Sequence, residues 1–152
     1  MAVVTEAAVT TPAAVTLAAY SDIWAAGTDQ PRLRELGLFN TSSTTAAVQT
    51  QLIRTSARGT QTSTLTPTAA ANQLLTSDRV TTSVVDFAWS TQPTLAAQAL
   101  RLAEIAGTVG SFVIWTWAQD GEPVILTGAG LAVQNASGAT GPVMRAYFNW
   151  EA

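Results

Sequence analysis

The chain of 152 residues is 47% hydrophobic and only 11% charged, with a formal net charge of −3 and seven cations that are all arginine. Its length fits one domain, which can bury roughly two-thirds of the surface of the unfolded chain. Cysteine, histidine and lysine are absent, which excludes disulfides, thiolate metal sites, the usual general base and lysine Schiff-base chemistry.

The first dozen residues are apolar apart from Glu6 and have no clear partner run. Residues 1–12 therefore predict either a first strand or an arm that adds to a neighbouring subunit. Val3 and Val4 are possible subunit contacts in either case. We assign residues 13–152 to a single β-sandwich domain.

A β-prone run follows Pro31 and ends at a Ser- and Thr-rich stretch. Strict alternation over this run, residues 32–39, places Leu36 and Leu38 on one face of a strand. The same alternation places Leu33 and Phe39 on the other face.

The next segments are shorter and more polar. Residues 47–55 alternate well enough to predict a strand. Residues 60–66 are polar on both faces, which indicates an edge strand or a strand covered by a neighbour. Residues 68–75 predict either a short helix or a loop that covers one end of the molecule.

Two longer runs occupy the middle of the chain. Residues 80–89 are rich in β-branched and aromatic side chains and predict a strand. Residues 95–105 have strong helical propensity but also alternate passably. Because tertiary context overrides propensity, we favour a strand here, preceded by a turn at Pro93.

The strongest strand pattern lies in residues 111–117, where Trp115 and Trp117 share a face. An Asp120-Gly121 pair follows, and residues 123–127 are again β-prone. An Asp-Gly pair between two such runs predicts a hairpin, because both central residues tolerate a positive φ.

Residues 131–135 and 143–150 predict the last two strands. An aromatic side chain near a chain end often anchors that end to a neighbour. We therefore expect Phe148 and Trp150 to be partly exposed and to be possible subunit contacts.

About eight or nine short strands at spacings of roughly ten residues predict an all-β fold. The count fits an antiparallel jelly-roll-like sandwich or barrel, and the alternative is an immunoglobulin-like sandwich. The pairing of the strands does not follow from the sequence.

Carboxylates and hydroxyls are the reactive groups that remain. Asp86 and Glu104 lie in apolar runs, and two carboxylates about 5 to 9.5 Å apart are typical of glycosidases. Nothing places this pair so close, so we expect carboxylates that are solvated or paired with arginine. Asp120 and Glu122 lack the alternating acidic ligands of a calcium loop, which favours a turn. We expect no catalytic residue, no cofactor and no metal site.

The tryptophans offer one binding hypothesis. Trp115, Trp117 and Trp89 would form a stacking platform for a sugar ring or a base if they faced solvent. The inward face of a sandwich also needs large side chains, and we favour that interpretation.

Direct nucleic-acid and membrane partners are not expected. The arginines cluster only as the pairs Arg32 with Arg34 and Arg54 with Arg58, which form no basic stripe. No run of about 18 apolar residues exists, and residues 1–12 lack the features of a secretory signal. Low charge and absent lysine are typical of the core of a protein–protein interface, although a GC-rich genome would produce the same bias.

Three stretches resemble a group of small proteins encoded among the structural genes of tailed bacteriophages. They are Arg34-Glu35-Leu36-Gly37-Leu38-Phe39-Asn40-Thr41, Gly110-Ser-Phe-Val-Ile-Trp-Thr-Trp117 and Ala146-Tyr147-Phe148-Asn149-Trp150-Glu151. The similarity spans most of the chain, but residues 64–77 depart from it. Its motifs are turn-and-strand signatures, so no functional residue carries over.

The resemblance implies a virion structural protein, made in the host cytoplasm, and in some members a capsid decoration (cement) subunit. The expected partners are then the major capsid protein and copies of the chain itself, with a homotrimer matching the local threefold axes of a shell. The alternatives are a carbohydrate-binding module, a tail or baseplate component, and a hydrolase that uses Asp86 and Glu104.

Overall fold

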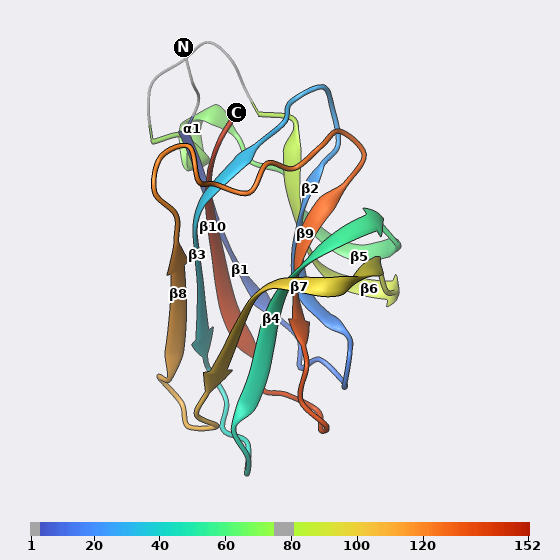
Figure 1. The fold of residues 1–152 in the computed structure, drawn as a ribbon, viewed down its shortest axis with the longest axis vertical. Coiled ribbons are helices and arrows are strands. Elements are labelled where there is room, and N and C mark those ends of the chain that lie inside the picture. The colour runs from blue at the N-terminus through green and yellow to red at the C-terminus, as the bar shows by residue number, and fades with distance from the viewer. Residues whose placement is uncertain (1–3, 75–80) are drawn as a thin grey trace.

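The computed structural model describes residues 4–74 and 81–152 and shows two antiparallel sheets packed as a sandwich (Figure 1). In order across the four-stranded sheet lie β1 (Val4–Thr11), β10 (Met144–Glu151), β3 (Arg32–Asn40) and β8 (Phe112–Thr116). In order across the six-stranded sheet lie β5 (Thr60–Leu65), β6 (Ser83–Thr91), β2 (Ala19–Ala25), β9 (Gly130–Asn135), β4 (Val48–Ala57) and β7 (Thr94–Ile105). The predicted all-β sandwich is confirmed. The strand order differs from the immunoglobulin arrangement, in which strands 1, 2, 5 and 4 face strands 3, 6 and 7.

Of the two alternatives for the N-terminal segment, the described residues form a first strand. β1 pairs antiparallel with β10 along its whole length, from Val4 opposite Glu151 to Thr11 opposite Met144. Its odd-numbered side chains are buried and its even-numbered ones are more exposed, as the two-residue period of a strand requires. Val4 is half-buried in this strand, and Val3 lies outside the described residues.

The C-terminal strand β10 runs through the middle of its sheet, between β1 and β3. The expectation that Phe148 and Trp150 are partly exposed is wrong, because both are fully buried in the main core. A strand flanked on both sides turns one set of alternate side chains toward the facing sheet, whatever its distance from the chain end. The Trp150 indole N–H donates to the buried Thr81 hydroxyl over 3.3 Å. Neither side chain offers a surface to another subunit.

A bulge in β3 changes the face of one predicted side chain. The register between β10 and β3 shifts where Asn149 faces Glu35 and Trp150 faces Leu33. An extra residue in one strand reverses the alternation beyond it. Leu33 therefore joins the core instead of sharing the outer face with Phe39.

The predicted hairpin at Asp120-Gly121 does not form. Only Asp120 adopts a positive φ, 65°, whereas the type I′ hairpin turn that an Asp-Gly pair favours needs it at both central residues. β8 pairs with β3 alone. The chain after the turn runs beside the start of β3 instead, where Leu33 N–H donates to the Pro123 carbonyl.

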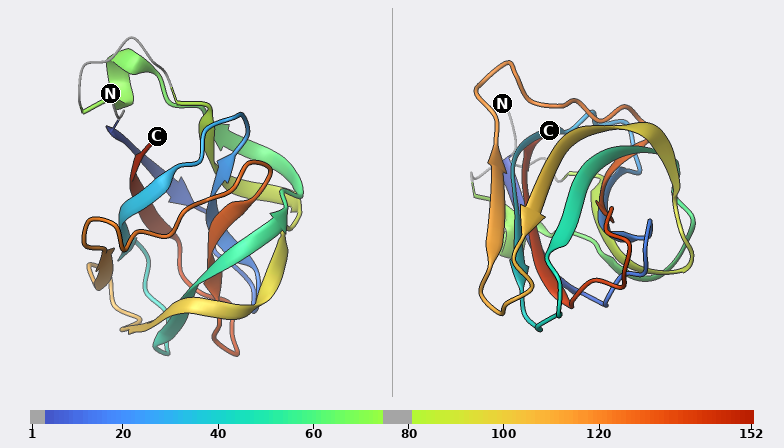
Figure 2. Two further views of the ribbon diagram at one scale, coloured as in Figure 1. Left: turned by 45° about the horizontal axis from the view of Figure 1, so that its top comes forward. Right: turned by 60° about the horizontal axis from the view of Figure 1, so that its bottom comes forward.

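The six-stranded sheet curls because two of its chain segments form one long bent ribbon (Figure 2). Residues 48–65 pair antiparallel with residues 83–105 on both sides of a corner. Gly59 lies at that corner with φ +74°, where a Cβ would overlap the Thr91 carbonyl. The prediction of a strand in residues 95–105 is confirmed. The predicted turn at Pro93 does not form, because Pro93 lies beside Gly59 at the corner and the chain continues from β6 into β7.

The curled ribbon covers the outer side of the two central strands, β2 and β9. One arm of the ribbon pairs β6 with β2, and the other pairs β4 with β9. Every residue of β2 and β9 is buried, so both of their faces are covered. The main core fills one side, and a second, smaller cluster fills the other; it consists of Ala19, Ile53, Ala132, Trp89 and Leu95.

The polar run in residues 60–66 is an edge strand, β5, as predicted. The helical alternative within residues 68–75 holds for the single turn α1 (Ala69–Asn72). Leu75 and Val80, at the ends of two predicted segments, lie outside the described residues. The described helical content is too short to cross a bilayer.

Replacing Trp150 by Ala tests the burial of the C-terminal aromatics. We expect the free energy of unfolding to fall by about 3–5 kcal/mol, because removing a buried indole leaves a cavity. Phe112→Ala is the matched control on the same sheet, and because its ring is largely exposed it should cost less than about 1 kcal/mol. Urea denaturation measures both. Equal stability of the two variants would show that Trp150 is not a core residue.

Candidate functional site

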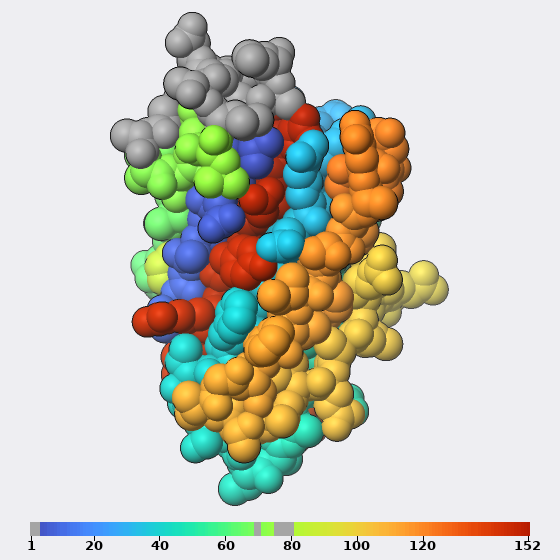
Figure 3. Space-filling model, turned by 90° about the vertical axis from the view of Figure 1, so that its left-hand side faces the viewer, coloured from blue at the N-terminus to red at the C-terminus, as the bar shows by residue number. Residues whose placement is uncertain are grey.

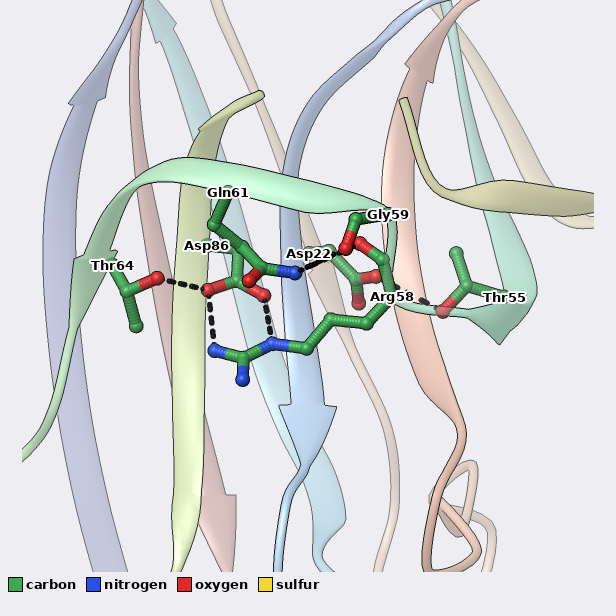
Figure 4. A network of polar contacts seen from close by, with 7 residues as sticks. All are labelled: Asp22, Thr55, Arg58, Gly59, Gln61, Thr64 and Asp86. Carbon is green, nitrogen blue, oxygen red and sulfur yellow. Dashed lines mark hydrogen bonds and ion pairs between the residues drawn. The ribbon is translucent and has the colours of Figure 1, made fainter. Parts of the chain in front are cut away.

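Two buried carboxyl groups face each other beneath the corner of the ribbon (Figure 4). Asp22 on β2 lies directly opposite Asp86 on β6, and both are fully buried. Glu104, the partner proposed for Asp86 from the sequence, is exposed on β7 at the sheet edge. Strands β2, β9 and β4 separate it from β6. The hydrolase pair of Asp86 and Glu104 is therefore contradicted.

Asp86 is paired with arginine, which was the favoured expectation. Arg58 donates to it through two nitrogens, Nε at 2.7 Å and Nη2 at 2.9 Å. The Thr64 hydroxyl donates a third bond over 2.5 Å. The hydrogen bonds to Asp86 raise the pKa of Arg58 above its usual range. Gln61 holds the same corner by donating to the carbonyls of Arg58 and Gly59.

Asp22 is held from the opposite side, across β9. The Thr55 hydroxyl on β4 donates to its Oδ2 over 2.9 Å. The two side chains meet above Gly130 of the intervening strand, where a Cβ would overlap both Asp22 Oδ1 and the Thr55 hydroxyl. The hydrogen bond therefore depends on the missing side chain at position 130.

Burial raises the pKa of Asp22 to about 8, and the neighbouring charge of Asp86 contributes to the rise. The hydrogen bond from Thr55 and the Arg58 cation act in the opposite direction. At neutral pH Asp22 therefore keeps its proton, while Asp86 forms its ion pair with Arg58. This avoids the high cost of burying an unpaired carboxylate. Both carboxyl groups are fully buried, and their hydrogen bonds to Thr55 and Arg58 fix the ribbon to the sheet.

The other residues that the sequence offered for a metal site or a stacking platform do not gather at one place. Asp120 forms an exposed ion pair with Arg32, 3.7 Å long. Across residues 4–74 and 81–152 no three acidic side chains gather as a metal site would require. Trp115 and Trp117 share a face, as predicted, and pack half-buried against the main core. Trp89 packs against the second cluster, so the three indoles form no common platform.

The surface best suited to a partner is the outer face of the four-stranded sheet (Figure 3). Four side chains form its apolar centre, which we name the aromatic patch: Phe39, Phe112, Ile114 and Tyr147. Phe112 is 60% exposed and Ile114 is 42% exposed. The Phe39 ring stacks on Phe112 with centroids 5.6 Å apart and on Tyr147 at 6.0 Å.

The absence of a side chain at Gly37 allows the Tyr147 ring to lie flat on the sheet. The Tyr147 ring lies over Gly37, where any Cβ would overlap the ring, and the Tyr147 hydroxyl donates to Glu35. Burial and this contact raise the pKa of Tyr147 above its usual range, so the hydroxyl remains a donor. The tyrosine is thus fixed in place before any partner arrives, which lowers the entropic cost of binding.

The three stretches that carry the sequence resemblance lie side by side on this face. They fall on β3, β8 and β10, and β3 pairs with both of the others. In comparisons with known proteins, no family, no curated protein and no solved structure matches the chain.

The aromatic patch was not predicted from the sequence. Val3, Val4, Phe148 and Trp150 were predicted as possible subunit contacts instead. The signal was present in residues 111–117. If Trp115 faces the core, the period of two requires Phe112 and Ile114 to face outward.

Replacing Asp22 by Asn should remove a pH dependence of stability. The folded state keeps a proton on Asp22 up to about pH 8, whereas the unfolded chain releases it near pH 3.9. The folded state therefore binds more protons between these values, and its stability falls as pH rises, by at most about 1.4 kcal/mol per pH unit. The contribution is complete below about pH 4 and lost above about pH 8.

The measurement is urea denaturation from about pH 5.5 to about pH 8.5, where no histidine contributes because the chain has none. Asp22→Asn keeps an acceptor for Thr55 and carries no charge, so its stability should be flat across this range. Asp120→Asn, at a carboxylate that is 85% exposed, should keep the wild-type slope. A flat wild-type profile would contradict the raised pKa.

Proposed function

We propose that this protein is a structural component of a tailed-phage virion that docks on the assembled capsid shell as a decoration subunit. The observation that carries the proposal is the exposed aromatic patch, built by the three strands on which the resemblance rests. Its partners are then the major capsid protein and copies of itself.

The patch has the anatomy of a protein–protein interface. Aromatic and aliphatic side chains occupy its centre, and charged side chains border it, with Arg145 beside Phe39 and Glu35 at the opposite end. Interfaces commonly combine an apolar centre with a polar rim that excludes water. The stacked rings lie on a sheet rather than a loop, which favours a rigid docking surface.

Such a subunit would stabilise a shell by mass action. A protein that binds only the assembled lattice lowers its free energy by RT ln(1 + [L]/Kd), about 2.7 kcal/mol per site at a hundredfold excess over Kd. Repetition over many sites multiplies this effect without any chemical step. The buried acidic pair would contribute indirectly, by holding the ribbon that supports the sandwich.

The carbohydrate-binding alternative needs indoles that face solvent together. Trp115 and Trp117 are half-buried against the main core, whereas Trp89 is half-buried against the second cluster. A tail or baseplate role would use the same patch. The location of the protein in purified particles, and the position of its gene relative to the major capsid gene, distinguish these two virion roles.

The direct test mixes the purified protein with shells of the encoding phage that lack it. We expect the wild type to co-sediment with shells and to raise the temperature at which they rupture. Phe112→Asp should weaken binding at least tenfold, because it desolvates a charge at the centre of the patch. Val15→Asp is the matched control: Val15 is 61% exposed but lies in the loop between β1 and β2, and its variant should bind as the wild type does.

Absence of wild-type binding would refute the decoration role. Binding that Phe112→Asp leaves unchanged would show that another surface docks. Circular dichroism and thermal unfolding must show that both variants remain folded.

A further inference from the structure

The two sheets have four edge strands, and three of them are protected against pairing with another chain. Unpaired edge N–H and C=O groups attract foreign strands, and native proteins cover or interrupt such edges. The segment after β5 covers the start of β1, where Leu74 N–H donates to the Val4 carbonyl and the Asn72 amide to the Glu6 carbonyl. β5 has three register shifts against β6 and carries only Thr, Gln and Ser before its final leucine. β7 has three register shifts against β4 and carries Arg101 and Glu104.

The fourth edge strand, β8, has none of these protections. Its sequence, Phe-Val-Ile-Trp-Thr, contains no charged residue and no proline. Its register with β3 is unbroken from Phe112 to Thr116. β8 is thus a regular, uncharged and largely apolar edge, which is the kind of strand that pairs with another chain.

The hydrogen bonds to β3 identify which groups of β8 are free. Trp117 N–H donates to the Arg34 carbonyl, and the Ser111 carbonyl accepts from Asn40. In an antiparallel ladder alternate residues bond to the same neighbour, so residues 111, 113, 115 and 117 bond toward β3. The N–H and C=O groups of Phe112, Ile114 and Thr116 therefore point toward the open edge.

We propose that β8 pairs antiparallel with β8 of a second copy of this chain, about a two-fold axis at Ile114. This register joins the four-stranded sheets of two subunits into one continuous sheet. Phe112 of each copy faces Thr116 of the other, and all three open residues become hydrogen-bonded pairs. This inference deepens the proposed function, on which it rests for its setting in a virion, by naming one partner of the same face.

Self-pairing fits the side chains on both faces of the strand. The two-fold axis preserves the alternation, so Phe112 and Ile114 of the two copies extend one outer patch. On the inner side, Val113 of each copy lies opposite Trp115 of the other, and both are half-exposed in the single subunit. An isologous contact of this kind closes on itself and produces no fibre.

Charge also favours a second copy. The chain has a net charge of −3, so an edge with acidic groups would repel its own copy. β8 has none, and residues 106–119, which include β8 and its flanking segments, are all uncharged. No like charges oppose one another across the pairing.

The size of the contact sets its strength. A standard interface buries about 800 Å² per partner, more than a five-residue strand supplies by itself. The pairing should therefore be weak and concentration-dependent in free solution. It is a two-fold contact, unlike the trimer expected from the sequence, so the assembly state discriminates between them.

Sedimentation velocity of the wild-type protein from about 1 µM to about 1 mM, a range that covers weak association, tests the proposal. We expect the mass to rise from one subunit to two. Thr116→Pro removes an edge N–H that no β3 bond uses, so it should keep the fold and remain a single subunit throughout. Thr116→Ala is the matched control and should associate as the wild type does.

Amide hydrogen exchange on the wild-type protein gives a second readout that needs no variant. Exchange at Phe112, Ile114 and Thr116 should slow at least about tenfold between the lowest and highest concentrations. Exchange at Val113 and Trp115, which bond to β3, should not change. A wild-type chain that stays a single subunit, a trimer, or association that Thr116→Pro leaves intact would each overturn the proposal.

The shell-binding assay separates this proposal from the decoration role. A wild type that binds shells but never associates in solution refutes self-pairing and leaves the decoration role standing. A wild type that forms the two-subunit species but does not bind shells supports self-pairing and refutes the decoration role. Loss of shell binding in Thr116→Pro, with a wild type that stays single, would show that a strand of the shell protein occupies the β8 edge instead.

Discussion

The bent ribbon of residues 48–65 and 83–105 determines most of the remaining structure. The ribbon folds over the outer side of β2 and β9, so both faces of these two strands are buried. A second interior therefore forms between the ribbon and the two strands. That interior contains a small apolar cluster and two buried aspartates. Their mutual repulsion is relieved by one arginine and one retained proton. The same ribbon leaves the opposite sheet uncovered on its outer side, where the aromatic patch lies.

The sequence predicted the strands better than their positions in the sheets. Local alternation identified the all-β class and nearly every strand, because burial of one face imposes a period of two. Residues 111–117 had the strongest pattern, yet they form an edge strand rather than a central one. Residues 143–150 form the central strand β10, so the terminal aromatics are buried. Position within a sheet depends on pairing between distant segments, and no local pattern encodes that pairing.

The buried acidic pair was only half visible in the sequence. Asp86 lies between two apolar residues, whereas Asp22 follows Ser21 and gives a weaker signal. Its role depends on the ladder of β2 and β6 and on a partner from β4 reached across β9. Similarly, the aromatic patch depends on Gly37, whose missing side chain is what allows the neighbouring ring to lie flat. The effect of such a glycine depends on side chains from neighbouring strands, so it can be recognised only when the strand pairing is known.

Gly130 shows how a close contact between three residues restricts the substitutions that the chain can accept during evolution. Any larger residue there occupies the space in which Asp22 and Thr55 meet, so a substitution at one of the three positions alters which residues the other two tolerate. A lone change at position 130 is disfavoured in this background, whereas smaller, uncharged residues at positions 22 and 55 would permit it. Distant variants of this protein should therefore exchange these three residues as a set rather than one by one.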